Sequence, residues 1–209
     1  MTNLFIFSND LRLEDNAALY NASLGRNGLE ALFLFNKDKW QLHYESPLKI
    51  KFQLDNLEII KEELDNLNIN LRVLSPKLDD ENTLILKEAL KINASQVFIN
   101  SEYGFNEKRS NENLRKLLAD NRIDLIEFDS SIINPKKIVT GAGTYFKVFT
   151  PYSRSFREEL NKEYLQCFPA PVKQQTKIGD SDEIPNFELE NTLKQNALKL
   201  YDCLLYTSP

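Results

Sequence analysis

Several residue types that mark common protein classes are scarce in this chain of 209 residues. The two cysteines, Cys167 and Cys203, form no CxxC pair, which argues against a disulfide framework and against a zinc site. The single histidine, His43, would have to serve alone in any Ser-His-Asp triad. We therefore expect no metal centre, and we predict a protein of a reducing, cytoplasmic compartment.

Long apolar runs and glycine-rich loops are also missing. No apolar stretch reaches the roughly 18 residues of a membrane span, and the N-terminus lacks the pattern of a signal peptide, so we expect no membrane partner. The six glycines form neither GxGxxG nor GxxxxGK[ST], which leaves a Rossmann dinucleotide site and a P-loop unsupported. The formal net charge of -5 does not indicate nucleic-acid binding by itself.

Five short apolar runs have the length and composition of buried strands. They are Leu4–Phe7, Leu29–Phe35, Ile69–Leu74, Gln96–Asn100 and Ile123–Phe128. Helix-forming patterns separate them, so the chain predicts an α/β fold with a five-stranded, parallel, doubly wound sheet of the Rossmann-like or flavodoxin-like type. The expected strand order is 3-2-1-4-5, which places strands one and four together at the switch point where ligands bind.

Local signals position the predicted helices. Asp15 or Asn16 is a candidate N-cap for a helix over Ala17–Leu24, and Ser46 followed by Pro47 opens the longest helix. The segment Asn36–Lys39 is predicted to be a polar loop. Asp79 or Asp80 is predicted to start a helix through Leu84, Leu86, Leu90 and Ile92.

The alternation of strands and helices stops after about residue 130. We predict an α/β domain over residues 1–130 and a linker over 131–188 with one helix, capped by Thr150 and ending near Tyr164. An amphipathic pattern in 189–209 is expected to begin a second domain, so the chain is expected to be a fragment. Residues 203–209 are similar to a translated sequencing adapter and are predicted to be non-native.

Three segments together resemble the DNA photolyase and cryptochrome family. Phe7–Asn16 is similar to the family's opening motif W-F-R-x-D-L-R-x-x-D-N, and Tyr103–Arg109 is similar to its Y-x-x-N-E-x-x-R-D loop. Lys147–Tyr152 resembles its Y-K-V-F-T-P-[FY] segment. Their order and spacing match, and the resemblance is strongest to the class I enzymes that repair cyclobutane pyrimidine dimers.

The resemblance implies a two-domain protein. The α/β domain would carry or shield a light-harvesting antenna, and a helical domain after the linker would bind FAD and the flipped-out dimer of UV-damaged DNA. Excited reduced flavin would donate the electron that splits the dimer, so the chemistry belongs to the flavin. No catalytic residue is therefore expected in this chain, and a monomer is expected.

Antenna residues are implied by the same resemblance. In folate-using members an Asn-Glu pair after strand four contacts 5,10-methenyltetrahydrofolate, and Asn106 and Glu107 match that pair. His43 and Asn9 are further candidates for the pocket. The alternative from the residues alone is that Asn106 caps the next helix, Glu107 lies in its first turn and His43 is an exposed loop residue.

Other matched positions suggest structural roles. Asp10 and Arg12 match the family and are predicted to hold the first turn as a charge-assisted pair. Lys147, Phe149, Thr150 and Tyr152 are predicted to pack between the two domains. Ile6 and Ser8 depart from the usual Trp and Arg, which leaves the identity of the antenna open.

The resulting functional prediction is the N-terminal part of a light-dependent DNA photolyase. The alternative is a cryptochrome-type photoreceptor without repair activity, since the residues that separate the two lie outside this chain. A stand-alone nucleotide- or flavin-binding module of the flavodoxin-like or universal-stress type would need a glycine-rich phosphate loop after strand one or four, and neither strand has one.

Overall fold

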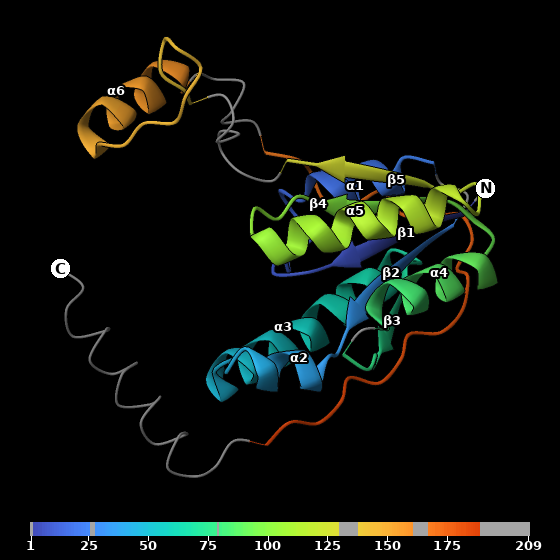
Figure 1. Ribbon diagram of the computed structural model, residues 1–209. Coiled ribbons are helices and arrows are strands. Elements are labelled where there is room, and N and C mark those ends of the chain that lie inside the picture. The colour runs from blue at the N-terminus through green and yellow to red at the C-terminus, as the bar shows by residue number, and fades with distance from the viewer. Residues whose placement is uncertain (1, 26–27, 79, 130–137, 161–166, 189–209) are drawn as a thin grey trace, which may run out of the picture.

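Five parallel strands form one sheet in the predicted order, β3-β2-β1-β4-β5, in the computed structural model of the chain (Figure 1). The strands are β1 (Thr2–Phe7), β2 (Leu29–Leu34), β3 (Asn70–Leu74), β4 (Ala94–Asn100) and β5 (Asp124–Phe128). The helices are α1 (Ala17–Ser23), α2 (Lys37–Leu42), α3 (Pro47–Asn66), α4 (Glu81–Lys91), α5 (Phe105–Ala119) and α6 (Phe149–Glu159). The structure describes residues 2–25, 28–78, 80–129, 138–160 and 167–188. The predicted start of a second domain and the predicted non-native tail, 189–209, lie outside these ranges.

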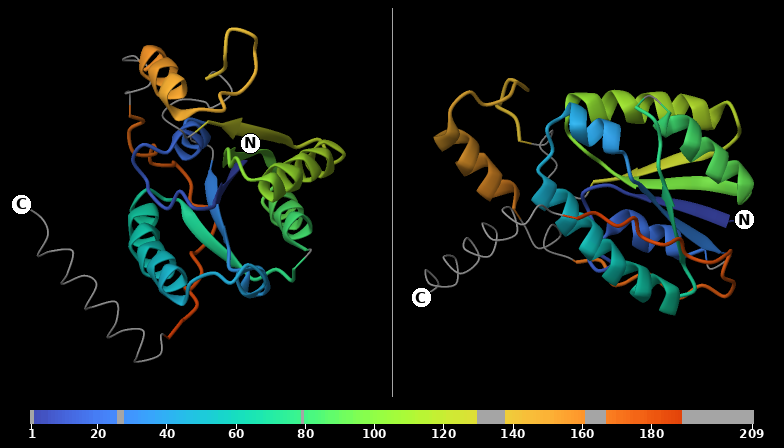
Figure 2. Two further views of the ribbon diagram at one scale, coloured as in Figure 1. Left: turned by 60° about the vertical axis from the view of Figure 1, so that its left-hand side comes forward. Right: turned by 90° about the horizontal axis from the view of Figure 1, so that it is seen from below.

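The sheet is covered on both faces, and Figure 2 shows it between two helix layers. Alternate residues of a strand point to opposite faces, so Phe5 and Phe7 join the core with α1 and α3. Leu4 and Ile6 join the core with α4 and α5. The inner strands β1 and β2 are largely apolar because both of their faces are buried. Within the described ranges, no helix combines the length and apolarity needed to cross a bilayer.

Two helix starts follow the predicted signals. The side chain of Asn16 is the N-cap of α1, and its Oδ1 accepts a hydrogen bond from the backbone N–H of Leu19 at 3.1 Å. Helix α3 begins at Pro47, where the missing N–H costs no hydrogen bond. Ser46 occupies the N-cap position of α3, although its side chain makes no capping hydrogen bond.

The predicted polar loop Asn36–Lys39 is wrong, because α2 begins at Lys37. The buried Asn36 is its N-cap and accepts a hydrogen bond from the backbone N–H of Lys39 at 2.9 Å. In the sequence, the capping amide is the main mark of this helix. The residues after it are mostly polar and form no apolar stripe, so the periodicity that marks longer helices is missing here.

Helix α4 begins after Asp80 as predicted, and only part of its apolar sequence faces the core. Leu90 is 47% exposed, whereas Ile85, Ala89 and Ile92 face the core. These three residues are spaced by four and three positions and form one helical stripe. That stripe carries Glu88 into the interior as well, and the buried carboxylate is accommodated by cationic partners.

Helix α6 begins before the predicted cap. Val148 is its extended N-cap residue, so Thr150 lies inside the first turn and the prediction that Thr150 caps the helix is wrong. Pro151 also lies in the first turn, where it needs no hydrogen-bond donor. The helix ends at Glu159, and the predicted end at Tyr164 lies outside the described residues.

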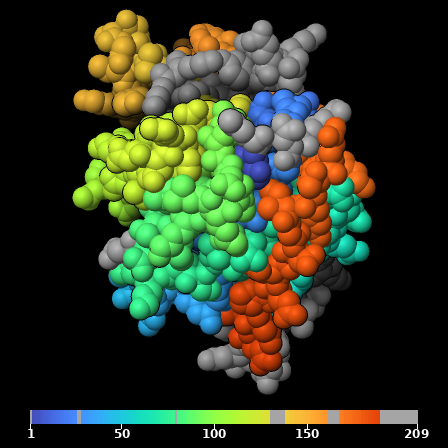
Figure 3. All heavy atoms as spheres, turned by 90° about the vertical axis from the view of Figure 1, so that its right-hand side faces the viewer, coloured from blue at the N-terminus to red at the C-terminus, as the bar shows by residue number. Residues whose placement is uncertain are grey.

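Residues 167–188, predicted as part of the linker, form an extended strap that lies against the α/β domain (orange in Figure 3). Gln174 anchors it and is only 2% exposed. The Gln174 Nε2 donates to the carbonyls of Ser23 and Val172 at 2.9 and 2.7 Å, and its Oε1 accepts from the N–H of Gly28 at 3.4 Å. The backbone N–H of Gln174 donates to the carbonyl of Leu67 at 2.9 Å. The strap is therefore fixed by a buried polar side chain.

Further along, the strap covers the edge strand β3. The N–H of Leu71 donates to Ser181 Oγ at 2.9 Å, and the N–H of Val73 donates to Asp182 Oδ2 at 2.8 Å. The N–H of Asp182 donates in turn to the carbonyl of Leu71 at 2.8 Å. An edge strand presents unpaired backbone groups that invite association, and these bonds satisfy part of that edge within the chain.

Replacing Gln174 with alanine should destabilise the domain. The substitution leaves the buried carbonyl of Ser23 without its side-chain donor, so we expect Gln174→Ala to lower the free energy of unfolding by about 2 kcal/mol. Urea denaturation followed by circular dichroism measures this. The exposed neighbour offers a matched control, since Gln175→Ala should change it by less than about 0.5 kcal/mol. Equal effects of the two variants would contradict the anchoring role of Gln174.

Candidate functional site

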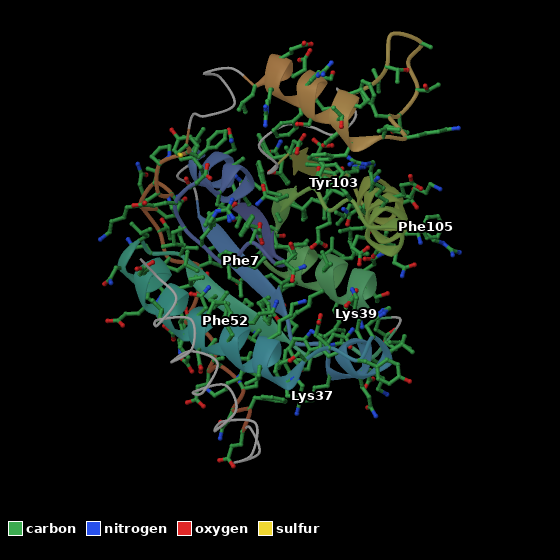
Figure 4. The ribbon with its side chains drawn as sticks, turned by 90° about the vertical axis from the view of Figure 1, so that its left-hand side faces the viewer. Phe7, Lys37, Lys39, Phe52, Tyr103 and Phe105 are labelled. Carbon is green, nitrogen blue, oxygen red and sulfur yellow. The ribbon has the colours of Figure 1, made fainter. Side chains whose placement is uncertain are left out.

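A cavity of about 560 Å³ opens at the carboxyl edge of the sheet, next to the ends of β1, β2 and β4. Its apolar floor includes Ile6, Ile85, Ile99 and Leu114, and polar side chains from α2, α3 and α5 form its walls. Figure 4 looks onto this edge, with Phe7 near the centre, Lys39 on the side of α2 and Phe105 on the side of α5. The cavity thus lies at the predicted switch point of the sheet.

The cavity gathers the four predicted antenna residues. Asn9 comes from the turn after β1, His43 is the C-cap residue of α2, and Asn106 and Glu107 lie in the first turn of α5. Three separate elements therefore bring these side chains to one cavity. Their binding of a ligand remains a prediction.

The first turn of α5 leaves the Asn-Glu pair available. Gly104 is the N-cap residue, so the alternative in which Asn106 caps this helix is wrong, whereas Glu107 does lie in the first turn. The Glu107 carboxylate folds back over Gly104, where an added Cβ would clash with Oε2. A residue with a side chain at 104 would therefore displace the carboxylate. Within the described ranges Glu107 forms no ion pair.

A buried amide fixes the turn after β1. The side chain of Asn100, at the end of β4, donates to the Asp10 carboxylate and to Asn16 Oδ1, the latter at 2.8 Å. The N–H of Ala18 donates to Asn100 Oδ1 at 3.2 Å, and the N–H of Ser8 donates to Asp10 Oδ1 at 2.8 Å. One side chain of β4 therefore connects the turn to the start of α1. Sequence reasoning missed this role, although an amide directly after the apolar run of β4 was its signal.

The predicted pairing of Asp10 with Arg12 is wrong. Arg12 Nε donates to the carbonyl of Asp15 at 3.0 Å, and its guanidinium lies 3.8 Å from the Asp15 carboxylate. Asp10 is 8% exposed, and its side chain is occupied by neutral donors instead. A guanidinium two residues away would have to enter that buried turn, so it pairs outside with Asp15.

The rim of the cavity carries a hydrogen-bonded bridge that sequence reasoning also missed. Asn9 Nδ2 donates to Glu102 Oε1 at 2.8 Å, and Gln53 Nε2 donates to Asn9 Oδ1 at 3.2 Å. The bridge joins α3, the β1 turn and the loop after β4. Nothing in the local sequence around Gln53 marks it, because its partner lies 44 positions earlier in the chain.

Charges on the α2 side of the cavity are paired. Lys39 Nζ lies 3.1 Å from Glu81 Oε2, and Glu81 Oε1 accepts from Asn36 Nδ2 at 2.9 Å. Lys49 pairs with Glu45 at 2.7 Å. The walls therefore offer mostly directed amide and carboxylate groups, which suit a planar heterocycle with hydrogen-bonding edges.

The remaining predicted residues lie away from the cavity. Lys147 and Val148 precede α6, Phe149 and Thr150 lie in its first turn, and Phe149 is 77% exposed. The ring of Phe149 contacts that of Tyr152 with centroids 6.4 Å apart. None of the residues of α6 is buried, so the helix presents an aromatic surface with no partner in the described part of the chain. The predicted interdomain role of these residues stays a prediction.

Asn100→Leu tests the dependence of the site on the buried amide. The variant leaves the Asp10 carboxylate and the Ala18 N–H without their partner, and we expect the free energy of unfolding to fall by about 3 kcal/mol. Thermal denaturation or urea denaturation measures it. Asn113→Leu, on the exposed face of α5, is the control and should change stability by less than about 0.5 kcal/mol. If Asn100→Leu lowers the free energy of unfolding no more than Asn113→Leu does, the hydrogen bonds of Asn100 do not stabilise the domain.

The sequence and fold match known proteins. A family model described as DNA photolyase matches residues 3–173. The deoxyribodipyrimidine photo-lyase of Buchnera aphidicola subsp. Baizongia pistaciae is 30% identical over 172 residues, covering 81% of this chain and 36% of that protein. The deoxyribodipyrimidine photo-lyase of Neurospora crassa is 29% identical over 178 residues, covering 79% of this chain and 29% of that protein.

A solved structure shows the same fold. The crystal structure of Synechocystis sp. PCC6803 cryptochrome superposes with a TM-score of 0.70 at 23% identity, covering 90% of this chain and 38% of that chain. The chain spans about a third of the length of these proteins.

Proposed function

The chain belongs to the DNA photolyase family, and we propose that it forms the antenna domain of a deoxyribodipyrimidine photolyase, an enzyme that splits cyclobutane pyrimidine dimers in UV-damaged DNA with light. The observation that carries the proposal is the cavity that gathers Asn9, His43, Asn106 and Glu107. Relatives of that name are similar over about four fifths of this chain. Because the chain spans about a third of their length, the reaction and its substrate are part of the proposal.

The cavity fits a pterin antenna, for which we propose 5,10-methenyltetrahydrofolate. A pterin edge offers both donors and acceptors in one plane, and the amide of Asn106 with the carboxylate of Glu107 supplies complementary groups. The apolar floor beside Ile6 and Ile99 suits the face of a flat ring. When bound, such a chromophore would absorb light for the flavin. The residues of this chain would bind and orient it and exclude water from its inner face.

We propose that FAD and DNA bind to the part of a photolyase that this chain does not match. The exposed aromatic surface of Phe149 and Tyr152, with Lys147 and Thr150 beside it, would pack between the two domains. If the amides of residues 149–152 exchange their hydrogens more slowly in the whole protein than in this chain alone, that result would support the packing. The proposal includes a monomer and a cytoplasmic location, and the two cysteines that form no CxxC pair agree with a reducing compartment.

The second candidate is a cryptochrome-type photoreceptor without repair activity. A cryptochrome structure shares the fold at 23% identity, so the fold is compatible with this alternative. The antenna cavity serves either role, so the cavity alone does not separate them.

Binding of the antenna can be measured directly. We expect the purified chain to retain the near-UV absorbance of added 5,10-methenyltetrahydrofolate after gel filtration and to lose fluorescence of Trp40, the single tryptophan, which lines the cavity. Glu107→Gln and Asn106→Ala each remove one directed hydrogen bond, and Glu107→Gln also removes the charge. We expect roughly 10-fold weaker binding for each.

Matched controls lie on the same helix. Glu112→Gln and Asn113→Ala change exposed residues of α5 outside the cavity and should leave binding unchanged. No retention of the pterin, or equal binding by all four variants, would rule out this antenna. Retention of a flavin in place of the pterin would keep the antenna role and replace the chromophore.

The repair activity needs the whole protein. With FAD bound and reduced, we expect blue light to restore thymine dimers in an oligonucleotide to monomers, measured by chromatography of the product. A dark sample is the control. Light-driven flavin reduction without any loss of dimers would favour the photoreceptor.

A further inference from the structure

Buried charges connect the sheet to the strap of residues 167–188. Glu30 of β2 and Glu88 of α4 are 2% and 6% exposed. Arg72 of β3 reaches both the interior and the strap, because its Nε lies 3.5 Å from Glu88 Oε1 and its Nη1 pairs with Asp182. The same Asp182 accepts the N–H of Val73 and so holds the strap on the edge of β3. Arg72 thus links a buried carboxylate to the contact that closes the strap.

The cluster has more carboxylates than cations when every group is ionised. Glu30, Glu88 and Asp182 face Arg72 and Lys91, and Lys91 is a half-exposed partner of Glu88. A buried excess of one negative charge is costly unless a proton neutralises it. A single proton on this cluster would therefore balance its charge.

Hydrogen bonding identifies the place for that proton. Asn70 Nδ2 donates to Glu30 Oε2 at 2.6 Å, whereas Glu30 Oε1, Asn70 Oδ1 and Arg72 Nε are buried and have no hydrogen-bond partner in the described part of the chain. The two oxygens are both acceptors when Glu30 is ionised. Protonation converts Glu30 into a donor and removes an unsatisfied acceptor.

The titration of Glu30 agrees with this geometry. Burial raises the pKa of Glu30 from 4.5 to about 7, against the opposing hydrogen bond from Asn70 and with a further increase from the nearby Glu88 carboxylate. Arg72 acts in the opposite direction and does not cancel the increase. The net effect moves the ionisation of the Glu30 carboxyl from the acidic range toward neutral pH.

We propose that Glu30, Glu88, Arg72 and Asp182 form a pH-sensitive latch, which holds the strap on β3 while Glu30 is neutral and loosens it when Glu30 ionises. An ionised Glu30 repels Glu88 and competes for Arg72, the cation on which Asp182 depends. Lys91 lies at the solvent side of Glu88 and cannot take the place of Arg72 beneath the strap.

A second charged contact of the strap should not respond in this pH range. Asp65 of α3 accepts from Ser181 Oγ at 2.6 Å and pairs with Lys177 at 2.9 Å. Although burial opposes the change, the hydrogen bonds from Ser181 and Lys177 lower the pKa of Asp65. This carboxylate stays ionised around neutral pH, so Glu30 is the group that gives strap closure its pH dependence.

The direction of the effect follows from proton linkage. In the closed form Asp182 engages Arg72, so this form binds the Glu30 proton more tightly than an open form in which Arg72 is released from the strap. Closure is therefore favoured at low pH. This preference for the closed form is lost as the pH rises from about 4.5 through about 7. Above the higher value, the closure equilibrium no longer changes with pH.

Hydrogen exchange of the intact 209-residue chain tests the latch. After correction for intrinsic exchange rates, we expect the protection of the Leu71, Val73 and Asp182 amides to fall roughly tenfold or more between pH 5.5 and pH 8. The amide of Phe5, in the central strand, should change less and reports global unfolding. Glu30→Gln keeps the shape of the side chain and removes the titration, so this variant should show a flat profile.

Two further variants separate the latch from general destabilisation. Asp182→Asn should lower strap protection at both pH values, and Glu58→Gln, an exposed carboxylate of α3, should keep the unmodified pH profile. A Glu30→Gln profile as steep as that of the original chain would overturn the proposal. So would an equal loss of protection at Phe5, or a Glu30 carboxyl that titrates near 4.5 by carbon NMR.

Discussion

The shape of the candidate site depends on the side-chain amide of Asn100. Its NH₂ group donates to the Asp10 carboxylate and to Asn16 from the end of β4, and its oxygen accepts the N–H of Ala18. The turn after β1 is thereby tied to the neighbouring strand and to the first helix at once. Asn9, on the same turn, then faces the loop after β4, where it meets Glu102. A short polar turn becomes a rigid wall of the cavity because a neighbouring strand supplies its hydrogen bonds.

Much of the fold could be predicted from the sequence, but few of the hydrogen bonds and ion pairs between polar side chains could. Strands buried on both faces are apolar runs, and strong N-caps such as Asn16 act locally, so the strand order and several helix starts were within reach. Asn106 and Glu107 could be placed at the cavity through a motif. The pairing of Arg72 with Asp182 could not be predicted, because the two residues are 110 positions apart and each has oppositely charged residues nearer in the sequence. The partner of Arg12 was also hard to predict, although the candidates lie close in sequence. Because Asp10 is buried, Arg12 pairs with Asp15 instead.

Two buried carboxylates of the domain are accommodated in different ways. Asp10 has N–H donors on both oxygens, and these hydrogen bonds hold the tight turn after β1. Glu30 has a single donor and a carboxylate neighbour, so burial favours its neutral form instead. The first arrangement holds the turn beside the cavity. The second leaves a carboxyl with a raised pKa near Arg72, which pairs with Asp182 of the strap.

The strap also imposes an order on biosynthesis. The groups that cover the edge of β3 come from Ser181 and Asp182, and Ser181 lies 110 positions after Leu71. During translation the five strands are complete long before those residues leave the ribosome, so the β3 edge stays open for several seconds at common elongation rates of about 5–20 residues per second. An open strand edge is where a nascent sheet associates with other chains. Chaperones that occupy such edges would therefore matter most for this protein in the interval between the synthesis of β5 and the arrival of the strap.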